Sequence, residues 1–251
     1  MDQHTETGTD APSPELSIII PVYNEPTNIG PVLRRLAANV RTPHEVLIVY
    51  DFDEDTTVPA VRAIQDQMPS VRLLRNKLGR GVLNAMKAGL AEARAPYLLI
   101  TMADGSDEIE LADRMVDLAR NGADIVAASR YAKGGRQIGG PRLKRTLSRI
   151  AGMSLSWFRI LPIHDATNNF RLYRRGYIQG VRIESTGGFE LALELSVKAA
   201  VAGRTLAEIP TTWRDRSEGQ SQFKLRAWLP RYARWYLFAV GARIGRRHFR
   251  P

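Results

Sequence analysis

The stretch Leu16-Ser17-Ile18-Ile19-Ile20-Pro21, with Val22-Tyr23-Asn24-Glu25 directly after it, decides the fold. A short apolar run that ends at a proline is typical of a strand buried in a parallel sheet. A helix start signal, Pro26-Thr27-Asn28, comes next, and apolar residues then recur at helical spacing at Ile29, Val32, Leu33, Leu36 and Val40. A buried strand followed by an amphipathic helix is the repeating unit of a parallel α/β sheet.

The same alternation continues along the chain. Further strands are predicted over residues 46–50, 71–74, 97–101, 124–128, 170–173 and 206–209, and helices over 58–68, 82–90, 109–120, 143–158 and 189–202. A Gly-rich loop is expected over residues 133–141. This pattern predicts an α/β fold with a mostly parallel central sheet and helices on both faces.

Polar residues follow four of the predicted strands. These groups are Tyr23-Asn24-Glu25, Asp51-Phe52-Asp53, Asn76-Lys77 and Ala103-Asp104. In open α/β sheets, ligands bind beyond the carboxyl ends of the strands. We therefore expect these four groups to share one ligand-binding edge.

Composition sets further bounds. The chain has 251 residues, a formal net charge of +10 and no cysteine, which excludes disulfides and cysteine-ligated zinc. The excess charge points to nucleic acid, an anionic membrane or phosphorylated substrates. Residues 1–15 are polar and contain no apolar signal segment, so we expect a disordered leader, a catalytic domain over 16–224 and a tail over 225–251.

The tail concentrates the charge. It holds seven Arg and no acidic residue, and its apolar residues, many of them aromatic, follow helical spacing with a break or restart expected at Pro230. Such a helix suits a membrane interface, and the alternative is a helix that packs back on the domain. No apolar run reaches the roughly 18 residues of a membrane span, so we expect a cytoplasmic protein, peripheral on the inner face of the membrane.

Several motifs, in order, resemble the family 2 glycosyltransferases of GT-A fold, and most of all the polyprenyl- or dolichyl-phosphate hexosyltransferases. The similarity covers residues 16–224. The opening Ile20-Pro21-Val22-Tyr23-Asn24-Glu25 resembles the first-strand signature, whose backbone cradles the nucleotide base, and Asp51 stands where the family contacts base or ribose. The alternative for Asp51 is an acidic turn that caps the next helix.

The segment Met102-Ala103-Asp104-Gly105-Ser106-Asp107 stands at the position of the family's Asp-Ala-Asp metal motif. The resemblance implies that Asp104, with help from Asp107, holds Mg²⁺ or Mn²⁺ against the diphosphate, because hard cations prefer oxygen ligands. Met102 replaces the first Asp, and a thioether is a poor ligand for a hard ion. The alternative is that Asp104 only caps the following helix.

Other matching residues lie in the second half of the chain. The resemblance implies a phosphate contact for Arg130 in Ser129-Arg130-Tyr131, and for Lys144 or Arg145 before Ser148. Asp165 and Arg171, in the segment 165–171, are expected to pair with each other or to flank the acceptor. Glu194 matches an acceptor-region Glu or is an exposed helix residue. Arg216 and Ser221 match a loop that binds the diphosphate, where Gln222 replaces the usual Lys.

The resemblance implies an inverting, metal-assisted transfer of a hexose from a nucleotide-sugar donor such as a GDP- or UDP-sugar. A lipid-phosphate acceptor needs cationic positioning rather than a strong base, since a phosphate monoester is largely dianionic at neutral pH. A hydroxyl acceptor needs a carboxylate base, for which Asp165 and Glu194 are candidates. The abundance of basic residues favours the polyprenyl phosphate, and the sequence leaves both acceptors open.

Two other classes of protein remain as alternatives. A non-catalytic nucleotide-sugar-binding protein is favoured by Met102 and Gln222 and opposed by the retained Asp51, Asp104, Arg171 and Arg216. A nucleic-acid binder is suggested by net charge alone. Because the basic residues are not interleaved with aromatics in a recognisable motif outside the tail, we expect no nucleic-acid partner.

Overall fold

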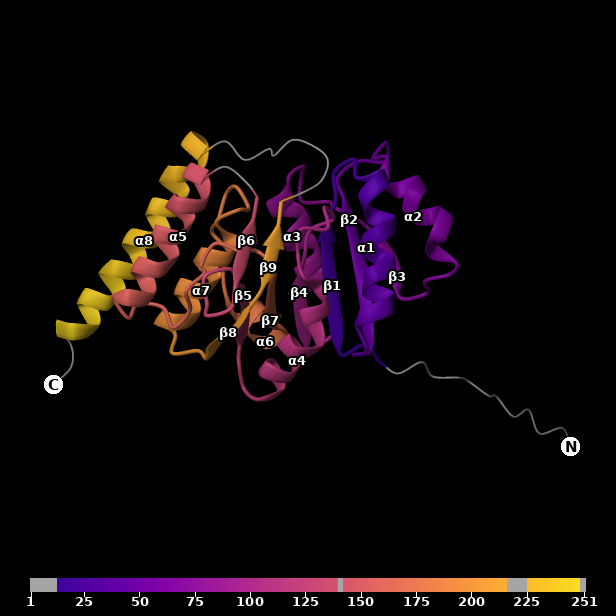
Figure 1. Cartoon of the computed structure of the whole chain (residues 1–251). Helices are drawn as coiled ribbons and strands as arrows, with labels where there is room; N and C mark the ends of the chain where they lie inside the picture. Colours follow the sequence, from indigo (N-terminus) through magenta and orange to yellow (C-terminus); the bar gives the residue numbers. More distant parts are fainter. Residues whose placement is uncertain (1–12, 140–141, 216–224, 249–251) are drawn as a thin grey trace, which may run out of the picture.

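The computed structural model describes residues 13–139, 142–215 and 225–248. In these segments one sheet has seven strands in the order β3-β2-β1-β4-β7-β5-β8, as Figure 1 shows. The strands are β1 (Leu16–Pro21), β2 (His44–Tyr50), β3 (Val71–Arg75), β4 (Tyr97–Ile100), β5 (Ile125–Ser129), β7 (Arg171–Arg174) and β8 (Leu206–Pro210). The predicted, mostly parallel sheet is confirmed.

The first four strands pair in parallel, and β1 lies between β2 and β4. Ile19 of β1 stands beside Leu47 of β2 and Ile100 of β4, which places the apolar runs in register. The connecting helices are α1 (Pro26–Asn39), α2 (Thr57–Gln65) and α3 (Val82–Glu92). All three helices were predicted from apolar spacing, with ends that differ by a few residues.

Strand β7 runs antiparallel between β4 and β5, a direction that the sequence did not reveal. The chain leaves β5 at the carboxyl edge of the sheet, makes the long helix α5 (Arg142–Trp157), and then enters β7 from that same edge. Residues 165–170 therefore lie at the carboxyl edge of the parallel strands, where the sequence predicts ligand binding. A parallel β7 would have placed them at the other end of the sheet.

Both faces of the sheet are covered. One face packs on α1, the 3-10 turn η1 (Ile109–Leu111) and α4 (Ala112–Arg120), which together take the place of the single predicted helix 109–120. The other face packs on α3 and α7 (Leu191–Val201). Helix α3 approaches β1 so closely that a Cβ at Gly89 would overlap the Ile19 side chain.

Three short elements were not predicted. The Gly-rich loop contains β6 (Arg136–Ile138), which pairs in parallel with β9 (Thr212–Arg214), and α6 (Arg175–Gly180) follows β7. Strands of three residues are too short to show a hydrophobic period. The β6–β9 pair joins two loops at the ligand-binding edge.

The tail forms α8 (Leu225–His248), which runs through Pro230 without the predicted break. Pro230 lies on the exposed side of the helix, while Trp235 and Ala239 are buried in a third cluster with α7 and the end of α5. Tertiary packing of this face offsets the proline. Helices α5 and α8 lie side by side at the β8 end of the molecule (Figure 1), where Ser154 and Tyr236 share a hydrogen bond of 3.0 Å. In the described segments, no helix is both long and apolar enough to cross a membrane.

Candidate active site

The loops after β1 and β2 are tied together at the carboxyl edge of the sheet. The buried Asp55 carboxylate accepts hydrogen bonds from the backbone N–H groups of Asn24 and Thr57, at 3.1 and 2.8 Å. The Asn24 amide oxygen accepts one from the Thr56 N–H at 3.1 Å, and the Glu25 N–H donates to Thr57 Oγ1 at 2.9 Å. These bonds hold Asn24 in a left-handed conformation (φ 52°), which Asn tolerates better than most residues.

Asp51 fastens the loop after β3. Its two carboxylate oxygens accept hydrogen bonds from the Asn76 side-chain amide and from the Gly81 N–H, both at 2.7 Å. Gly81 precedes α3, so Asp51 does not cap α2 as the alternative held. Lys77 lies in the fastened loop and is exposed. The three polar groups after β1, β2 and β3 thus share one edge, as predicted.

Aromatic rings lie above these loops. Tyr23 is 61% exposed and meets the Phe52 ring edge to face at 5.7 Å between centroids. The Arg80 guanidinium lies over the Phe52 ring at 4.9 Å. The two aromatic rings and the Arg80 guanidinium could bind a planar ligand with polar edges, because aromatic rings and guanidinium groups both stack on aromatic ligands.

The loop after β4 carries Asp104, which is half-buried and accepts a hydrogen bond from the Ser106 N–H at 3.1 Å. Ala103 is buried beneath it. Asp107 is buried too, and its carboxylate accepts hydrogen bonds from Thr101 and from the Met102 N–H at 2.9 and 3.1 Å. Burial raises the pKa of Asp107 to about 7, and the neighbouring Asp104 carboxylate adds to the increase. The buried Asp107 carboxylate therefore stabilises the conformation of the loop that carries it.

Within the described segments, no three acidic or histidine side chains gather into a metal-binding group. The loop still fits a divalent cation, because Mg²⁺ is commonly held by one or two carboxylates together with substrate phosphates and water. Asp104 supplies one such carboxylate. The inward orientation of Asp107 does not support the direct ligand role that the sequence suggested for it.

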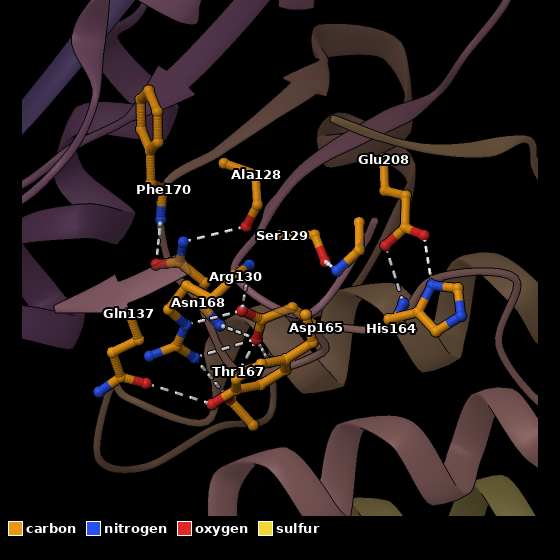
Figure 2. Close-up of polar contacts among 12 residues, drawn as sticks. Ala128, Ser129, Arg130, Gln137, His164, Asp165, Thr167, Asn168, Phe170 and Glu208 are labelled. Carbon is orange, nitrogen blue, oxygen red and sulfur yellow. Dashed lines mark hydrogen bonds and ion pairs between the residues drawn. The ribbon is translucent and has the colours of Figure 1, made fainter. Parts of the chain in front are cut away.

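Arg130 and Asp165 form the central ion pair of the site, which Figure 2 shows. Arg130 Nε and Nη2 donate to the two oxygens of Asp165 at 2.7 and 3.0 Å, and Nη2 also donates to Thr167 Oγ1 at 2.9 Å. Burial alone would raise the pKa of Asp165, but the Arg130 guanidinium holds it below its usual value. The Asp165 side chain is fully buried, whereas 12% of the Arg130 side chain is exposed.

Of the two possibilities for Asp165 and Arg171, a pair between the carboxylate and the guanidinium does not form, although the two residues share a hydrogen bond. Arg171 lies fully buried on β7, and its Nη2 donates to the Asp165 backbone oxygen at 2.7 Å rather than to the carboxylate. Its Nη1 donates to the Ala192 carbonyl oxygen and to Ser196 Oγ on α7. Burial lowers the pKa of this guanidinium. Arg171 thus holds the Asp165 segment against α7, and no part of its side chain reaches the surface.

Glu194 is neither exposed nor open to a substrate. It is fully buried, and its carboxylate accepts hydrogen bonds from the Glu184 and Ser185 N–H groups at 2.6 and 2.7 Å. Lys198, one helical turn further on, pairs with it at 2.7 Å. Glu194 therefore shapes the loop before α7.

Three carboxylates that stabilise loops of the site were not predicted from the sequence. Asp55 is described above, Glu190 binds the N–H groups of residues 186–188, and Glu108 accepts the Thr212 N–H at 2.7 Å. Only Asp55 carries a signal, since an Asp-Thr-Thr sequence before a helix is typical of capping. Glu108, together with a hydrogen bond from the Arg214 N–H to the Ser106 backbone oxygen, joins the Asp104 loop to β9.

Six residues that the sequence analysis singled out cannot be placed in the site. Arg216, Ser221 and Gln222 lie outside the described residues, as do the side chains of Lys144, Arg145 and Ser148.

Comparison with known proteins shows the family to which the chain belongs. The family model for glycosyl transferase family 2 matches residues 17–182. A dolichol-phosphate mannosyltransferase from Pyrococcus furiosus is 27% identical over 213 residues, which are 84% of this chain but only 59% of that protein. An undecaprenyl-phosphate mannosyltransferase from Micrococcus luteus is 29% identical over 211 residues, 81% of this chain and 85% of its own length.

The fold has solved counterparts. A mannosyltransferase from Pyrobaculum calidifontis, solved in complex with GDP-mannose and Mn²⁺, superposes with a TM-score of 0.63 at 19% identity. The match covers 92% of this chain and 64% of that one. The predicted GT-A fold is therefore confirmed.

Proposed function

Since the chain belongs to the family 2 glycosyltransferases, we propose that it transfers a hexose from a GDP- or UDP-sugar to a polyprenyl phosphate, with inversion and with the help of Mg²⁺ or Mn²⁺. Relatives whose names specify dolichol phosphate and undecaprenyl phosphate support the acceptor class. The solved neighbour with GDP-mannose and Mn²⁺ supports the donor and the metal.

One observation carries the choice of acceptor: neither candidate general base is available. A hydroxyl acceptor must lose its proton to a carboxylate during transfer. Asp165 is fully buried in an ion pair that lowers its pKa, and Glu194 is fully buried among N–H donors and Lys198. A phosphate monoester is largely dianionic at neutral pH and attacks without such a base. The site therefore favours a phosphate acceptor.

Different loops of the site bind the donor, the metal ion and the acceptor in this proposal. The backbone of residues 21–25 and the rings of Tyr23 and Phe52 receive the nucleotide base, and the Asp51–Asn76 loop presents Lys77 to the donor. Asp104 would hold a divalent cation, which would supply charge neutralisation for the departing nucleotide diphosphate. Arg130, fixed by both oxygens of Asp165, presents a pre-oriented positive charge to the acceptor phosphate. Arg171 and Glu194 position these groups without touching substrate.

A peripheral membrane contact belongs to the same proposal, since a polyprenyl phosphate resides in a bilayer. Of the exposed large apolar side chains in the described segments, most lie on or just after α5 and on α8: Ile150, Trp157, Phe158, Leu229, Leu237 and Phe238. Arginines accompany them, among them Arg231 and Arg234. Aromatic, aliphatic and arginine side chains together suit a helix at a membrane interface. We place the enzyme on the cytoplasmic, inner face of the membrane.

The test is transfer of radiolabelled sugar from a panel of GDP- and UDP-sugars, with Mg²⁺ or Mn²⁺, into added polyprenyl phosphate. We expect metal-dependent label in the organic extract, reduced by about 100-fold or more in Asp104→Asn. Asp66→Asn removes an equal charge from the exposed end of α2 and should leave transfer unchanged. Release of free nucleotide without label in the lipid extract would overturn the proposal that polyprenyl phosphate is the acceptor. If folded protein released no nucleotide from any donor, the donor class would be overturned.

A further inference from the structure

A small groove lies between the ends of α5, α7 and α8, and neither Arg130 nor Asp165 lines it. Its space is about 320 Å³ when the open solvent at its mouth is counted. Its floor includes Val197, Ala200 and Val201 of α7 together with Ala239 and Ala242 of α8, although more of the exposed lining is polar than apolar. The small alanine side chains leave room for a narrow apolar group.

Two arginines line this groove, Arg159 just after α5 and Arg243 on α8, and none of the described residues that line it is acidic. The Arg243 Nε is buried and has no hydrogen-bond partner in the part of the chain that the structure describes. A buried donor without an acceptor costs free energy, so such an atom calls for an explanation. An anionic group bound in the groove would supply the missing acceptor once the Arg243 side chain turned this shielded nitrogen toward it.

Arg159 occupies a backbone position that ordinarily belongs to glycine. Its φ is 53°, in the left-handed region, and its N–H closes the end of α5 on the Ser156 oxygen at 2.8 Å. Glycine is the usual residue where a helix ends in this conformation. A long cationic side chain in a strained position is a pointer to function, because the strain must be offset elsewhere.

The surroundings of the groove are those of a membrane surface. Trp157 and Phe158, the two residues before Arg159, are 70% and 65% exposed. Leu237 and Phe238 of α8, just before the groove residue Ala239, are 67% and 44% exposed. Aromatic side chains next to arginines are typical of the level at which lipid headgroups lie.

We propose that this groove binds one anionic phospholipid of the membrane, with the phosphate between Arg159 and Arg243 and the start of an acyl chain on the alanine-lined floor. The inference rests on the membrane contact proposed above and adds to it a discrete site. Diffuse attraction to an anionic surface depends only on the number of charges near it. A discrete site depends on these two arginines.

The first test is titration of the full chain with monomeric dihexanoyl-phosphatidylglycerol, followed by NMR. We expect saturable binding of one lipid, weakened by about ten-fold or more in Arg159→Gly and in Arg243→Gln, since a charge-assisted bond is lost in each. Arg149→Gln, an exposed residue of α5, is the matched control and should bind as the wild type. Binding that does not saturate, or equal loss in the control, would overturn the site.

The variant Arg159→Gly separates function from folding. Glycine relieves the left-handed backbone, so the Tm should stay the same or rise while lipid binding falls. A fall in Tm together with binding would instead assign Arg159 a structural role and overturn the proposal. Transfer to a polyprenyl phosphate dispersed in neutral detergent should be unchanged in Arg159→Gly, so failure of the groove and failure of the transferase proposal give different results.

Discussion

Asp165 illustrates how one buried side chain holds the site together. It accepts two side-chain hydrogen bonds from Arg130, and Asp165→Asn keeps the shape while removing the charge. Breaking a buried ion pair from one side leaves an uncompensated charge and costs about 3–5 kcal/mol. We expect this loss in the free energy of unfolding, measured by urea denaturation. Asp53→Asn breaks the exposed pair with Arg75 and should cost about 1 kcal/mol or less. An equal loss in both variants would contradict the argument.

The same residue predicts a dependence of stability on pH. The pKa of Asp165 is lower in the folded protein than its unfolded value of about 3.9. The contribution of Asp165 is therefore fully present above that value and is lost as the pH falls through the lower, folded pKa. The urea concentration at the midpoint of unfolding, measured from pH 6 downward, should fall in the wild type. In Asp165→Asn it should fall less, because the contribution of the Asp165 carboxylate is already absent. Parallel curves would show that other carboxylates govern acid unfolding.

For individual residues, the sequence predicted the positions of the candidate site residues in the fold better than it predicted their contacts. Asp51, Asp104, Arg130 and Asp165 all lie at the predicted edge of the sheet. Asp165 nevertheless pairs with Arg130, 35 positions away, instead of with Arg171 six positions away. That choice depends on the antiparallel entry into β7, which buries the Arg171 side chain and which no local pattern reveals. Glu194 was misplaced for a similar reason, since helical spacing does not show which loop folds over a helix.

Among the elements, α3 packs unusually close to the sheet, and this closeness gives a prediction. Gly89→Ala would raise helix propensity by about 1 kcal/mol, yet its Cβ would overlap the Ile19 side chain on β1. Overpacking of a tight core costs about 1–3 kcal/mol, so we expect net destabilisation. Gly30→Ala in α1 meets only the flexible Arg34 side chain, at 3.6 Å, and should stabilise the protein. Urea unfolding of the two variants measures the difference, and changes of the same sign would refute it.

The elements that the sequence predicted best are those with the longest patterns. Buried strands 16–21 and 46–50 and the helix between them follow from apolar runs and helical spacing alone. The β6–β9 pair was missed because each strand has three residues and because pairing joins positions more than 70 residues apart. The continuity of α8 through Pro230 was missed because packing on α7 outweighed a local helix-breaking signal.

For the whole molecule, the arrangement of α8 decides how a membrane contact should be tested. Trp235 is buried between Lys198 of α7 and Arg234, with cation–ring distances of 4.8 and 4.9 Å, and Tyr232 donates to the Phe189 oxygen at 2.7 Å. Deleting residues 225–251 would therefore open the third core cluster, and any loss of membrane binding would be confounded by unfolding. Substitutions on the outer face of α5 and α8 avoid this difficulty.

Trp157 and Leu237 are the most exposed apolar side chains of this face, at 70% and 67%. If they enter the interfacial region of a bilayer, each contributes about 1.5 kcal/mol or more, so Trp157→Ser and Leu237→Ser should each weaken partition into phosphatidylcholine vesicles by about ten-fold. Neutral vesicles isolate this apolar contribution from that of the arginines. Leu78→Ser, at a residue 56% exposed in the donor loop, removes similar surface elsewhere and should not change partition. Unchanged sedimentation of both helix variants with the vesicles would mean that the outer face of α5 and α8 does not enter the bilayer, and the arginines alone would then have to account for any membrane contact.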